Sequence, residues 1–154
     1  MLISAMTEQE CREVFAQASF GRLACSLGDQ PYVVPVCFAY EEDSVYVFST
    51  VGKKIEWMRA NPKVCVQIDA ITNQSQWVSV IANGRYEELT EPQFGSERDH
   101  ARTLLEKRNQ WWLNALAERR IESSDESIAP LFFRVRIDSM TGLFAGKKLA
   151  GAAT

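Results

Sequence analysis

One stretch of the chain, residues 45–66, constrains the fold more than any other. Its letters, VYVFSTVGKKIEWMRANPKVCV, read as a strand, a short turn that contains a glycine, a helix and a second strand. The helix is expected over Lys53–Ala60. It should stop at Asn61, because the residue before a proline is pushed out of the helical region and asparagine tolerates a left-handed cap. The segment therefore predicts a helix inserted between two strands.

The start of this helix is a candidate phosphate site. Ser49 and Thr50 end the first strand, and Lys53 and Lys54 open the helix. A helix N-terminus presents unpaired backbone N–H groups and a positive dipole end, and hydroxyl and ammonium groups add further donors for an anion. Cations at this end of a helix oppose its dipole unless an anion lies between them. The alternative is that both lysines are solvated surface residues.

The remaining pattern indicates an antiparallel barrel with added helices, because many short strands occur without regular alternation with helices. The whole chain, residues 1–154, fits one domain. Strands are expected at residues 21–27, 31–39, 45–49, 63–69, 77–89, 131–137 and 140–144. Further helices are expected at residues 7–18, where Thr7 and Glu10 form a capping box, and at residues 96–119.

Two strands carry a predicted irregularity. Pro31–Ala39 is almost continuously apolar, so we expect burial on both faces. Pro35 lacks a ladder donor, so the strand should be unpaired or bulged there, with backbone groups free to face a ligand. The alternative is an edge-strand proline without a function. Asn83-Gly84 predicts a bulge inside the long strand at residues 77–89.

Charge and composition exclude some classes of function. The chain has 17 basic and 20 acidic residues and a net charge of −3. This balance disfavours a nucleic-acid or membrane-surface binder, which would carry a basic excess. No apolar run is long enough to span a bilayer, and the N-terminus has no signal-peptide pattern, so we expect a cytoplasmic protein.

The cysteines and the single histidine do not form a metal-binding pattern. The four cysteines, Cys11, Cys25, Cys37 and Cys65, include no C-x-x-C pair, and we expect buried, reduced thiols and no metal. His100 is the only histidine and falls on a charged helical stretch, which favours a solvated side chain. One histidine still leaves a haem ligand open.

Several short motifs occur in a recognisable order between Thr7 and Leu89. They are Gly21-Arg22-Leu23, Pro31–Val36, Ser49, Gly52-Lys53-Lys54, Asn61-Pro62, Trp77–Val80 and Gly84. In this order and spacing the chain resembles the FMN-binding split-barrel family, which includes pyridoxamine 5′-phosphate oxidases and nitroimidazole-resistance-like proteins. The resemblance implies a six-stranded Greek-key split barrel that dimerises and binds FMN in a groove between the subunits.

The resemblance also implies roles for particular residues. The phosphate would be held by Ser49, Thr50, Lys53 and Lys54, and the isoalloxazine ring would lie along the backbone of Val34, Pro35 and Val36. Ser79 matches a polar flavin contact, although an outward-facing strand serine is the alternative. Phe48 stands where some relatives carry a histidine, which weakens the case for histidine-dependent chemistry. Arg134 and Arg136 lie near the C-terminus but match no clear substrate motif.

Three functions remain open from the sequence. The first is an FMN-dependent oxidoreductase acting on a small electrophile, such as a nitro compound or a quinone, with no catalytic acid or base assigned. The second is a non-catalytic flavin-binding sensor or storage module. The third is a split barrel that uses haem or a deazaflavin. In each case we expect a homodimer, with Trp111 or Trp112 of the long helix available for the contact.

Overall fold

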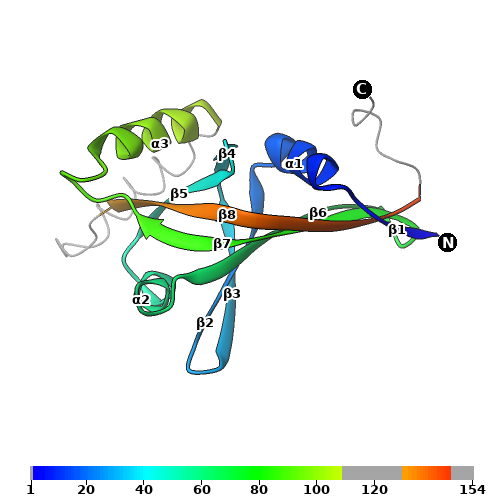
Figure 1. The fold of residues 1–154 in the computed structure, drawn as a ribbon, viewed down its shortest axis with the longest axis horizontal. Helices are drawn as coiled ribbons and strands as arrows, with labels where there is room; N and C mark the ends of the chain where they lie inside the picture. Colours follow the sequence, from blue (N-terminus) through cyan, green and yellow to red (C-terminus); the bar gives the residue numbers. More distant parts are fainter. Residues whose placement is uncertain (1, 109–129, 147–154) are drawn as a thin grey trace, which may run out of the picture.

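The computed structural model describes residues 2–108 and 130–146 of the chain. Its strands are β1 (Ile3–Ala5), β2 (Phe20–Leu27), β3 (Gln30–Cys37), β4 (Ala39–Glu41), β5 (Ser44–Thr50), β6 (Lys63–Asn73), β7 (Gln76–Glu88) and β8 (Pro130–Ala145). Its helices are α1 (Glu8–Gln17), α2 (Lys53–Ala60) and α3 (Gly95–Arg108). Figure 1 shows the strands as one strongly curved sheet, with α1 and α3 above the long strands in this view and α2 below them.

All strand pairs are antiparallel, in the order β3-β2-β6-β7-β8-β5-β4, and β1 adds to β8. The two ends of this order, β3 and β4, do not pair with each other in the described part of the chain, so the barrel stays split. Six of the strands are long and two have three residues each. The expected antiparallel split barrel is therefore confirmed.

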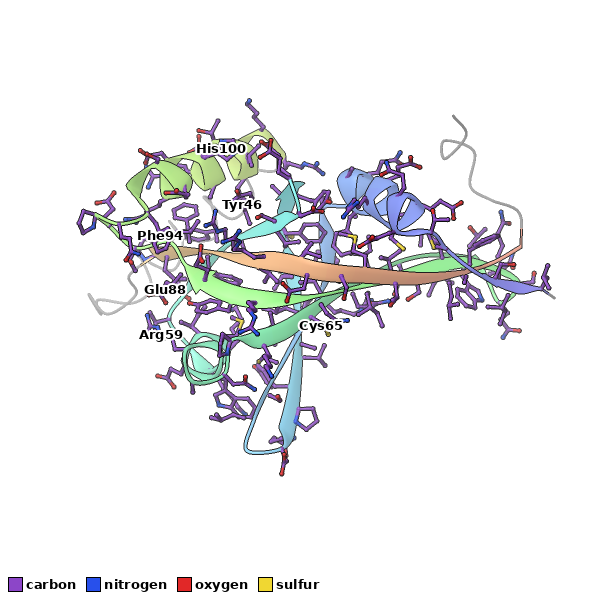
Figure 2. The ribbon with its side chains drawn as sticks, viewed as in Figure 1. Tyr46, Arg59, Cys65, Glu88, Phe94 and His100 are labelled. Carbon is purple, nitrogen blue, oxygen red and sulfur yellow. The ribbon has the colours of Figure 1, made fainter. Side chains whose placement is uncertain are left out.

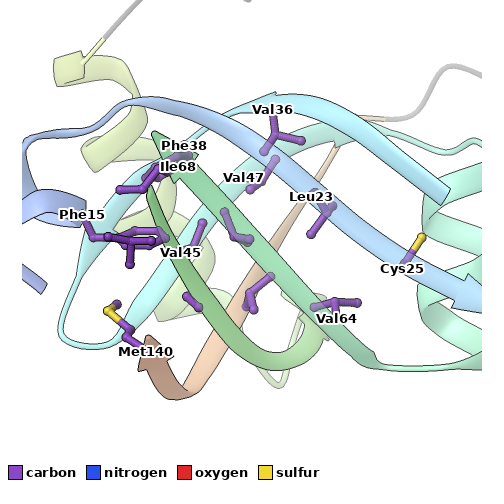
Figure 3. Packing of buried hydrophobic residues seen from close by; sticks show 14 of the residues in the cluster. Phe15, Leu23, Cys25, Val36, Phe38, Val45, Val47, Val64, Ile68 and Met140 are labelled. Carbon is purple, nitrogen blue, oxygen red and sulfur yellow. The ribbon is translucent and has the colours of Figure 1, made fainter. Parts of the chain in front are cut away.

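The main core lies inside the curve of the sheet. Side chains alternate in and out along a strand, and buried residues accordingly recur at every second position over much of β2, β6 and β7. Figure 3 shows how Phe15 of α1 and Phe38 fill one end of this core, with Val64 towards the other. A second, smaller cluster lies on the outer face, where Ala101 and Leu105 of α3 cover Tyr46 and Phe132. Among the described residues, α3 thus buries a part of the outer face of the sheet.

The predicted irregularity at Asn83-Gly84 is confirmed, but the extra residue lies on the neighbouring strand. Asn83 pairs with Ser139 and Gly84 pairs with Ile137, which leaves Asp138 of β8 as the bulged residue. The two C-terminal strands expected at residues 131–137 and 140–144 are therefore one strand, Pro130–Ala145. A bulge absorbs one residue and lets the ladder continue, so the polar break in the sequence does not end the strand.

Both expectations for residues 31–39 are wrong. Strand β3 lies at the edge of the sheet, and the side chain of Val33 is 62% exposed. Pro35 pairs with Arg22 in a register that runs unbroken from Phe20 to Leu27. An edge strand bonds to one neighbour only and donates to it from alternate residues, so a proline fits there without a bulge.

The helices match the sequence closely, with one difference. Thr7 caps α1 and forms the predicted capping box with Glu10. Helix α2 has the predicted bounds, Lys53–Ala60, but Asn61 is extended, with φ −135°, and does not form a left-handed cap. The restriction that Pro62 places on the preceding residue explains the extended backbone. Helix α3 is described as far as Arg108, and the rest of the helix expected to residue 119, including Trp111 and Trp112, lies outside the described residues.

None of the helices described for this chain combines the length and the apolar character that a membrane span requires.

Gly84 provides a test of this fold, because β7 and β8 approach most closely beside the bulge. A Cβ atom at Gly84 would collide with the backbone oxygen of Arg136 and come within 2.9 Å of its carbonyl carbon. Backbone atoms in a ladder cannot move aside, so we expect Gly84→Ala to lower the free energy of unfolding by about 3 kcal/mol. Urea unfolding measures this loss.

The matched control is Gly95→Ala at the start of α3, where an added Cβ would meet no heavy atom within 4 Å. It should unfold at or above the wild-type urea concentration, since alanine favours the helix. Equal stabilities for the two variants would contradict the close approach of β7 and β8 at Gly84.

Candidate functional site

The N-terminus of α2 differs from that of α1 in having no cap from a side chain. The N-cap residue of α2 is Gly52, which forms no side-chain hydrogen bond, whereas Thr7 and Glu10 satisfy the start of α1. A Cβ at Gly52 would meet no heavy atom within 4 Å, so there is open space beside the helix end. The first N–H groups of any helix have no partner within the helix. The start of α2 can therefore accept an external anion.

The two predicted hydroxyl residues lie at the end of β5, shortly before this helix start. Ser49 is buried, and its Oγ donates a hydrogen bond to the carbonyl oxygen of Thr50 at 3.1 Å. Thr50 is half-buried. A hydroxyl has one proton to donate and two lone pairs. Ser49 would therefore have to rotate away from Thr50 before it could donate to an anion at the helix start.

Lys53 takes a position that the sequence did not predict. Its Nζ lies 4.9 Å from the ring centroid of Tyr32 and 4.8 Å from that of Trp57. The two rings are themselves 5.5 Å apart. Trp57 is one turn further along α2, and Tyr32 belongs to β3, so the lysine connects the helix to the edge strand. An anion at the helix start would have to compete with this cation–π contact, which is worth about 0.5–2 kcal/mol.

Lys54 faces a different neighbour. Burial raises the pKa of the Cys25 thiol, and the positive charge of Lys54 partly offsets that rise. The two lysines, adjacent in sequence, therefore differ in their surroundings: Lys53 lies over Tyr32 of β3, and the charge of Lys54 acts on the Cys25 thiol of β2.

The segment Val34–Val36 lies on the open edge of the sheet. Val36 is buried and Val34 packs against the main core, while Pro35 faces outward opposite Arg22. The side of β3 away from β2 has no strand partner in the described residues, and β3 also comes into contact with β5. The open seam of the barrel therefore runs between β3 and β5, beside the strand end that leads into α2.

Ser79 belongs to a polar group on the outer face of the sheet, which we call the outer-face cluster. Its members are Arg22, Gln67, Asp69 and Ser79. The Nε2 of Gln67 donates to Ser79 Oγ at 3.1 Å and to Asp69 Oδ2 at 3.0 Å. Nη1 of Arg22 donates to the same Asp69 oxygen at 3.2 Å.

The outer-face cluster shares a face with Pro35. Pro35 pairs with Arg22, and Arg22 pairs in turn with Gln67. Arg22 belongs to the sequence motif Gly21-Arg22-Leu23, but the sequence predicted no role for it. Gln67 and Asp69 alternate with buried residues along β6, and this alternation in the sequence could have placed both side chains on the outer face.

Helix α2 is attached to β7 by a triad of hydrogen-bonding side chains. Nε of Arg59 donates to Glu88 Oε1 at 2.9 Å, and the Tyr86 hydroxyl donates to the same oxygen at 2.7 Å. Figure 2 shows Arg59 on α2 next to Glu88 on β7. Partial burial acts to raise the pKa of Glu88, but the bonds from Arg59 and Tyr86 outweigh it and hold that pKa below its usual value. Burial and the bond to Glu88 raise the pKa of Tyr86.

His100, Phe48 and Arg134, which the sequence also singled out, have local partners. Nε2 of His100 lies 3.2 Å from Glu41 Oε1, and its ring meets Tyr46 edge-on. Phe48 packs against Phe132, with ring centroids 5.2 Å apart. Arg134 forms an ion pair with Glu87.

The described residues contain no group of three His, Cys, Asp or Glu side chains that would hold a metal ion. Cys11 and Cys25 are buried, and Cys37 and Cys65 are half-buried. Burial raises the pKa of the Cys65 thiol. That the cysteines are reduced and that the protein holds no metal both stay predictions.

Replacing Glu88 with glutamine tests the attachment of α2. A carboxyl group whose folded pKa is depressed stabilises the fold fully above its unfolded pKa, and this stabilisation is lost as the pH falls through the folded pKa. The ordinary glutamate value is 4.5. Below that pH, the free energy of unfolding of the wild type should fall more steeply than that of Glu88→Gln. Urea unfolding at about pH 7 and about pH 3 measures the difference.

The control for this experiment is Glu106→Gln, which removes an exposed carboxylate on α3 that joins no ion pair among the described residues. It should keep the wild-type pH dependence. If Glu88→Gln kept it as well, the triad would not contribute to stability.

Comparison with known proteins places the chain in a family. A family model described as pyridoxamine 5′-phosphate oxidase matches residues 7–143. An uncharacterized protein of Rhizobium meliloti is 42% identical over 143 residues, which cover 92% of this chain and 95% of the relative.

Solved structures agree with this placement. A crystal structure of an FAD-binding protein from Mesorhizobium loti is 41% identical, covers 95% of this chain and 100% of its own, and superposes with a TM-score of 0.78. An FAD-binding protein from Mycobacterium smegmatis is 18% identical, with a TM-score of 0.61 over 92% of this chain and 99% of its own, and so shows the same fold. The family match over most of the chain, together with these relatives, shows that the protein belongs to the pyridoxamine 5′-phosphate oxidase family.

Proposed function

We propose that this protein binds a flavin nucleotide, FMN, in a groove between two subunits. The observation that carries the proposal is the uncapped N-terminus of α2, which begins at Gly52 with open space beside it. Ser49 and Thr50 lie at the strand end just before this helix. A phosphate dianion there would gain hydrogen bonds from the helix N–H groups and would offset the charge of Lys53 and Lys54.

The flavin ring would lie along the open edge of β3, in the part formed by Val34, Pro35 and Val36. An edge strand offers unpaired backbone donors and acceptors, and the apolar side chains beside them suit an aromatic ring. The outer-face cluster, with Ser79 and Gln67, would supply side-chain hydrogen bonds on the same face. When bound, a flavin supplies hydride and electron transfer, and the protein's part is to bind and orient it.

FAD is the second candidate cofactor. It is favoured by the 41% identical protein from Mesorhizobium loti, which is named as FAD-binding. FMN carries a phosphate monoester and FAD carries a diphosphate bridge, so the two differ most at the start of α2. Heat release of the bound cofactor, followed by chromatography against FMN and FAD standards, separates the two candidates.

We propose an oxidoreductase that reduces a small electrophile, such as a nitro compound or a quinone, in the cytoplasm. The alternatives are a flavin sensor or storage module and a barrel that holds haem or a deazaflavin. The absorbance spectrum of the purified protein distinguishes flavin from haem. Reduction by NADH or NADPH, followed by turnover on a panel of electrophiles, distinguishes an enzyme from a binding module.

A second copy of the chain would cover an apolar part of the outer face, which we call the apolar face. Its members are Phe20, Val33, Ile71, Ile81 and Leu143, with side chains between 40% and 70% exposed. The strand registers place all five on the side of the sheet that carries Arg22 and Ser79. Exposed apolar patches of this kind mark association surfaces.

We therefore expect the protein to be a homodimer in solution, as measured by light scattering at micromolar concentration. Ile81→Glu should yield monomers, because it places a carboxylate at the centre of the apolar face. Leu27→Glu is the control, since Leu27 is also 40% exposed but lies at the tip of the β2–β3 hairpin. A wild-type monomer with flavin bound would rule out the homodimer.

Removing both lysines tests the phosphate site. Charge-assisted hydrogen bonds are worth about 1.5–3 kcal/mol each. The double variant Lys53→Ala/Lys54→Ala should therefore bind FMN at least about 100-fold more weakly. The affinity for riboflavin, which has no phosphate, should change little. Titration of flavin fluorescence measures both ligands.

Lys107→Ala on α3 is the control for the loss of a surface charge, and its affinity for FMN should equal that of the wild type. If the double variant lost affinity for FMN and for riboflavin equally, the lysines would act on the fold or on the flavin ring and not on the phosphate. An unchanged affinity for FMN would remove the phosphate-site assignment.

A further inference from the structure

Three basic residues form a line across neighbouring strands on the outer face of the sheet, and we call them the cationic row. They are Lys63 at the start of β6, Arg85 of β7 and Arg136 of β8. Lys63 pairs directly with Arg85, and Arg85 pairs directly with Arg136. Directly opposed side chains have Cβ atoms about 5 Å apart, and like charges in such pairs are destabilising. The row therefore holds two unfavourable pairs side by side.

Neighbouring arginines are neutralised, but the cationic row is not. Arg134 pairs with Glu87, Arg59 with Glu88, and Arg22 with Asp69. Within the described part of the chain, no carboxylate forms an ion pair with any of the three side chains of the row. All three are exposed. An anion from outside the chain would relieve their mutual repulsion.

The row borders two hollows in the surface. One hollow, of about 460 Å³, is lined by Lys63 and Arg85 together with Ser26, Cys65 and Asn83. The other, of about 830 Å³, is lined by Arg85 and Arg136 together with Tyr46. Arg85 lines both hollows, so it stands at the centre of the row and of the surface around it.

Acidic groups near the row do not cancel its charge. Asp138, the bulged residue of β8, lines both hollows. Glu42, Asp43 and Glu87 line the second hollow, but Asp43 pairs with Arg12 and Glu87 pairs with Arg134. Glu42 and Asp138 form no ion pair among the described residues, so the three cations of the row exceed the unpaired carboxylates around the two hollows by one.

The cationic row is separate from the start of α2. Lys63 follows the C-terminal end of that helix, and the eight residues of α2 span about 12 Å. Along the strands the row lies about 13 Å from Ile81, which is four residues from Arg85 on β7, and about 26 Å from Ile71, which is eight residues from Lys63 on β6. A ligand on the row would contact neither the helix start nor Ile71.

We propose that the cationic row binds a small polyanion that carries two adjacent phosphoryl groups. The three cations extend over about 10 Å, which suits two linked groups better than one. The planar guanidinium groups of Arg85 and Arg136 present parallel donors that match phosphoryl oxygens. This second anion site goes beyond the proposed binding of one flavin nucleotide.

Calorimetric titration of the full chain with inorganic pyrophosphate, in the presence of saturating FMN, tests the proposal. We expect binding by the wild type, about tenfold weaker binding by Arg85→Gln, and partial recovery in Arg85→Lys. Lys107→Gln removes one exposed charge from α3 and should bind as the wild type does. Inorganic phosphate should bind more weakly than pyrophosphate.

Several results would overturn the proposal. They are the absence of pyrophosphate binding by the wild type, an unchanged affinity in Arg85→Gln, or an equal loss in Lys107→Gln. Loss of FMN affinity in Arg85→Gln, in parallel with that for pyrophosphate, would mean that the row belongs to the flavin site. The flavin assignment depends instead on Lys53 and Lys54, so either proposal can fail without the other.

Thermal unfolding without any ligand gives an independent reading. Relief of the two like-charge pairs should raise the melting temperature of Arg85→Gln above that of the wild type at low ionic strength, and added salt should reduce the difference. A lower melting temperature for Arg85→Gln would show that the row is not under electrostatic strain, and would remove the reason to expect an anion there.

Discussion

Strand β3 has a hydrogen-bonding partner on one side only, and the candidate site depends on this open edge. The sheet curves until β3 comes into contact with β5, but within the described residues the two do not pair. Closure would have occupied the backbone groups of Val34–Val36 and enclosed the end of β5. The split instead leaves backbone donors and acceptors beside the start of α2, so one feature of the sheet would serve both the ring and the phosphate of the flavin that we propose.

Two parts of the molecule, for which we propose an anion, differ in electrostatic balance from the parts whose polar groups find partners within the chain. At the start of α1 the chain satisfies its own N–H groups, and Glu88 holds Arg59 and Tyr86. At the start of α2 no side chain caps the helix, and along the cationic row no carboxylate of the described residues forms an ion pair. Uncompensated charge of one sign is unfavourable in an isolated fold, and this is the reason that we propose an anion at both places.

Two glycines show how closely the backbone must pack to build this sheet. A Cβ at Gly21 would lie 2.7 Å from the carbonyl oxygen of Gln67, and one at Gly84 would collide with the backbone of Arg136. Each glycine therefore lets a strand approach its neighbour. Gly21 lies next to Arg22 of the outer-face cluster, and Gly84 lies next to Arg85 of the cationic row. The glycines that permit close packing thus also help to position the charged side chains beside them.

Local rules of sequence were enough to determine the bounds of α2 and the cap of α1, because each depends on residues within a few positions of one another. They also indicated an irregularity at Asn83-Gly84, but the register of β7 and β8 decided that the extra residue is Asp138. The tertiary structure alone decided which strand lies at the edge, and so why Val33 is exposed and Pro35 needs no bulge. It also decided that Lys53 lies between Tyr32 and Trp57, and that Lys63, Arg85 and Arg136 meet in one row. These contacts depend on the register between strands far apart in the chain, which no local pattern encodes.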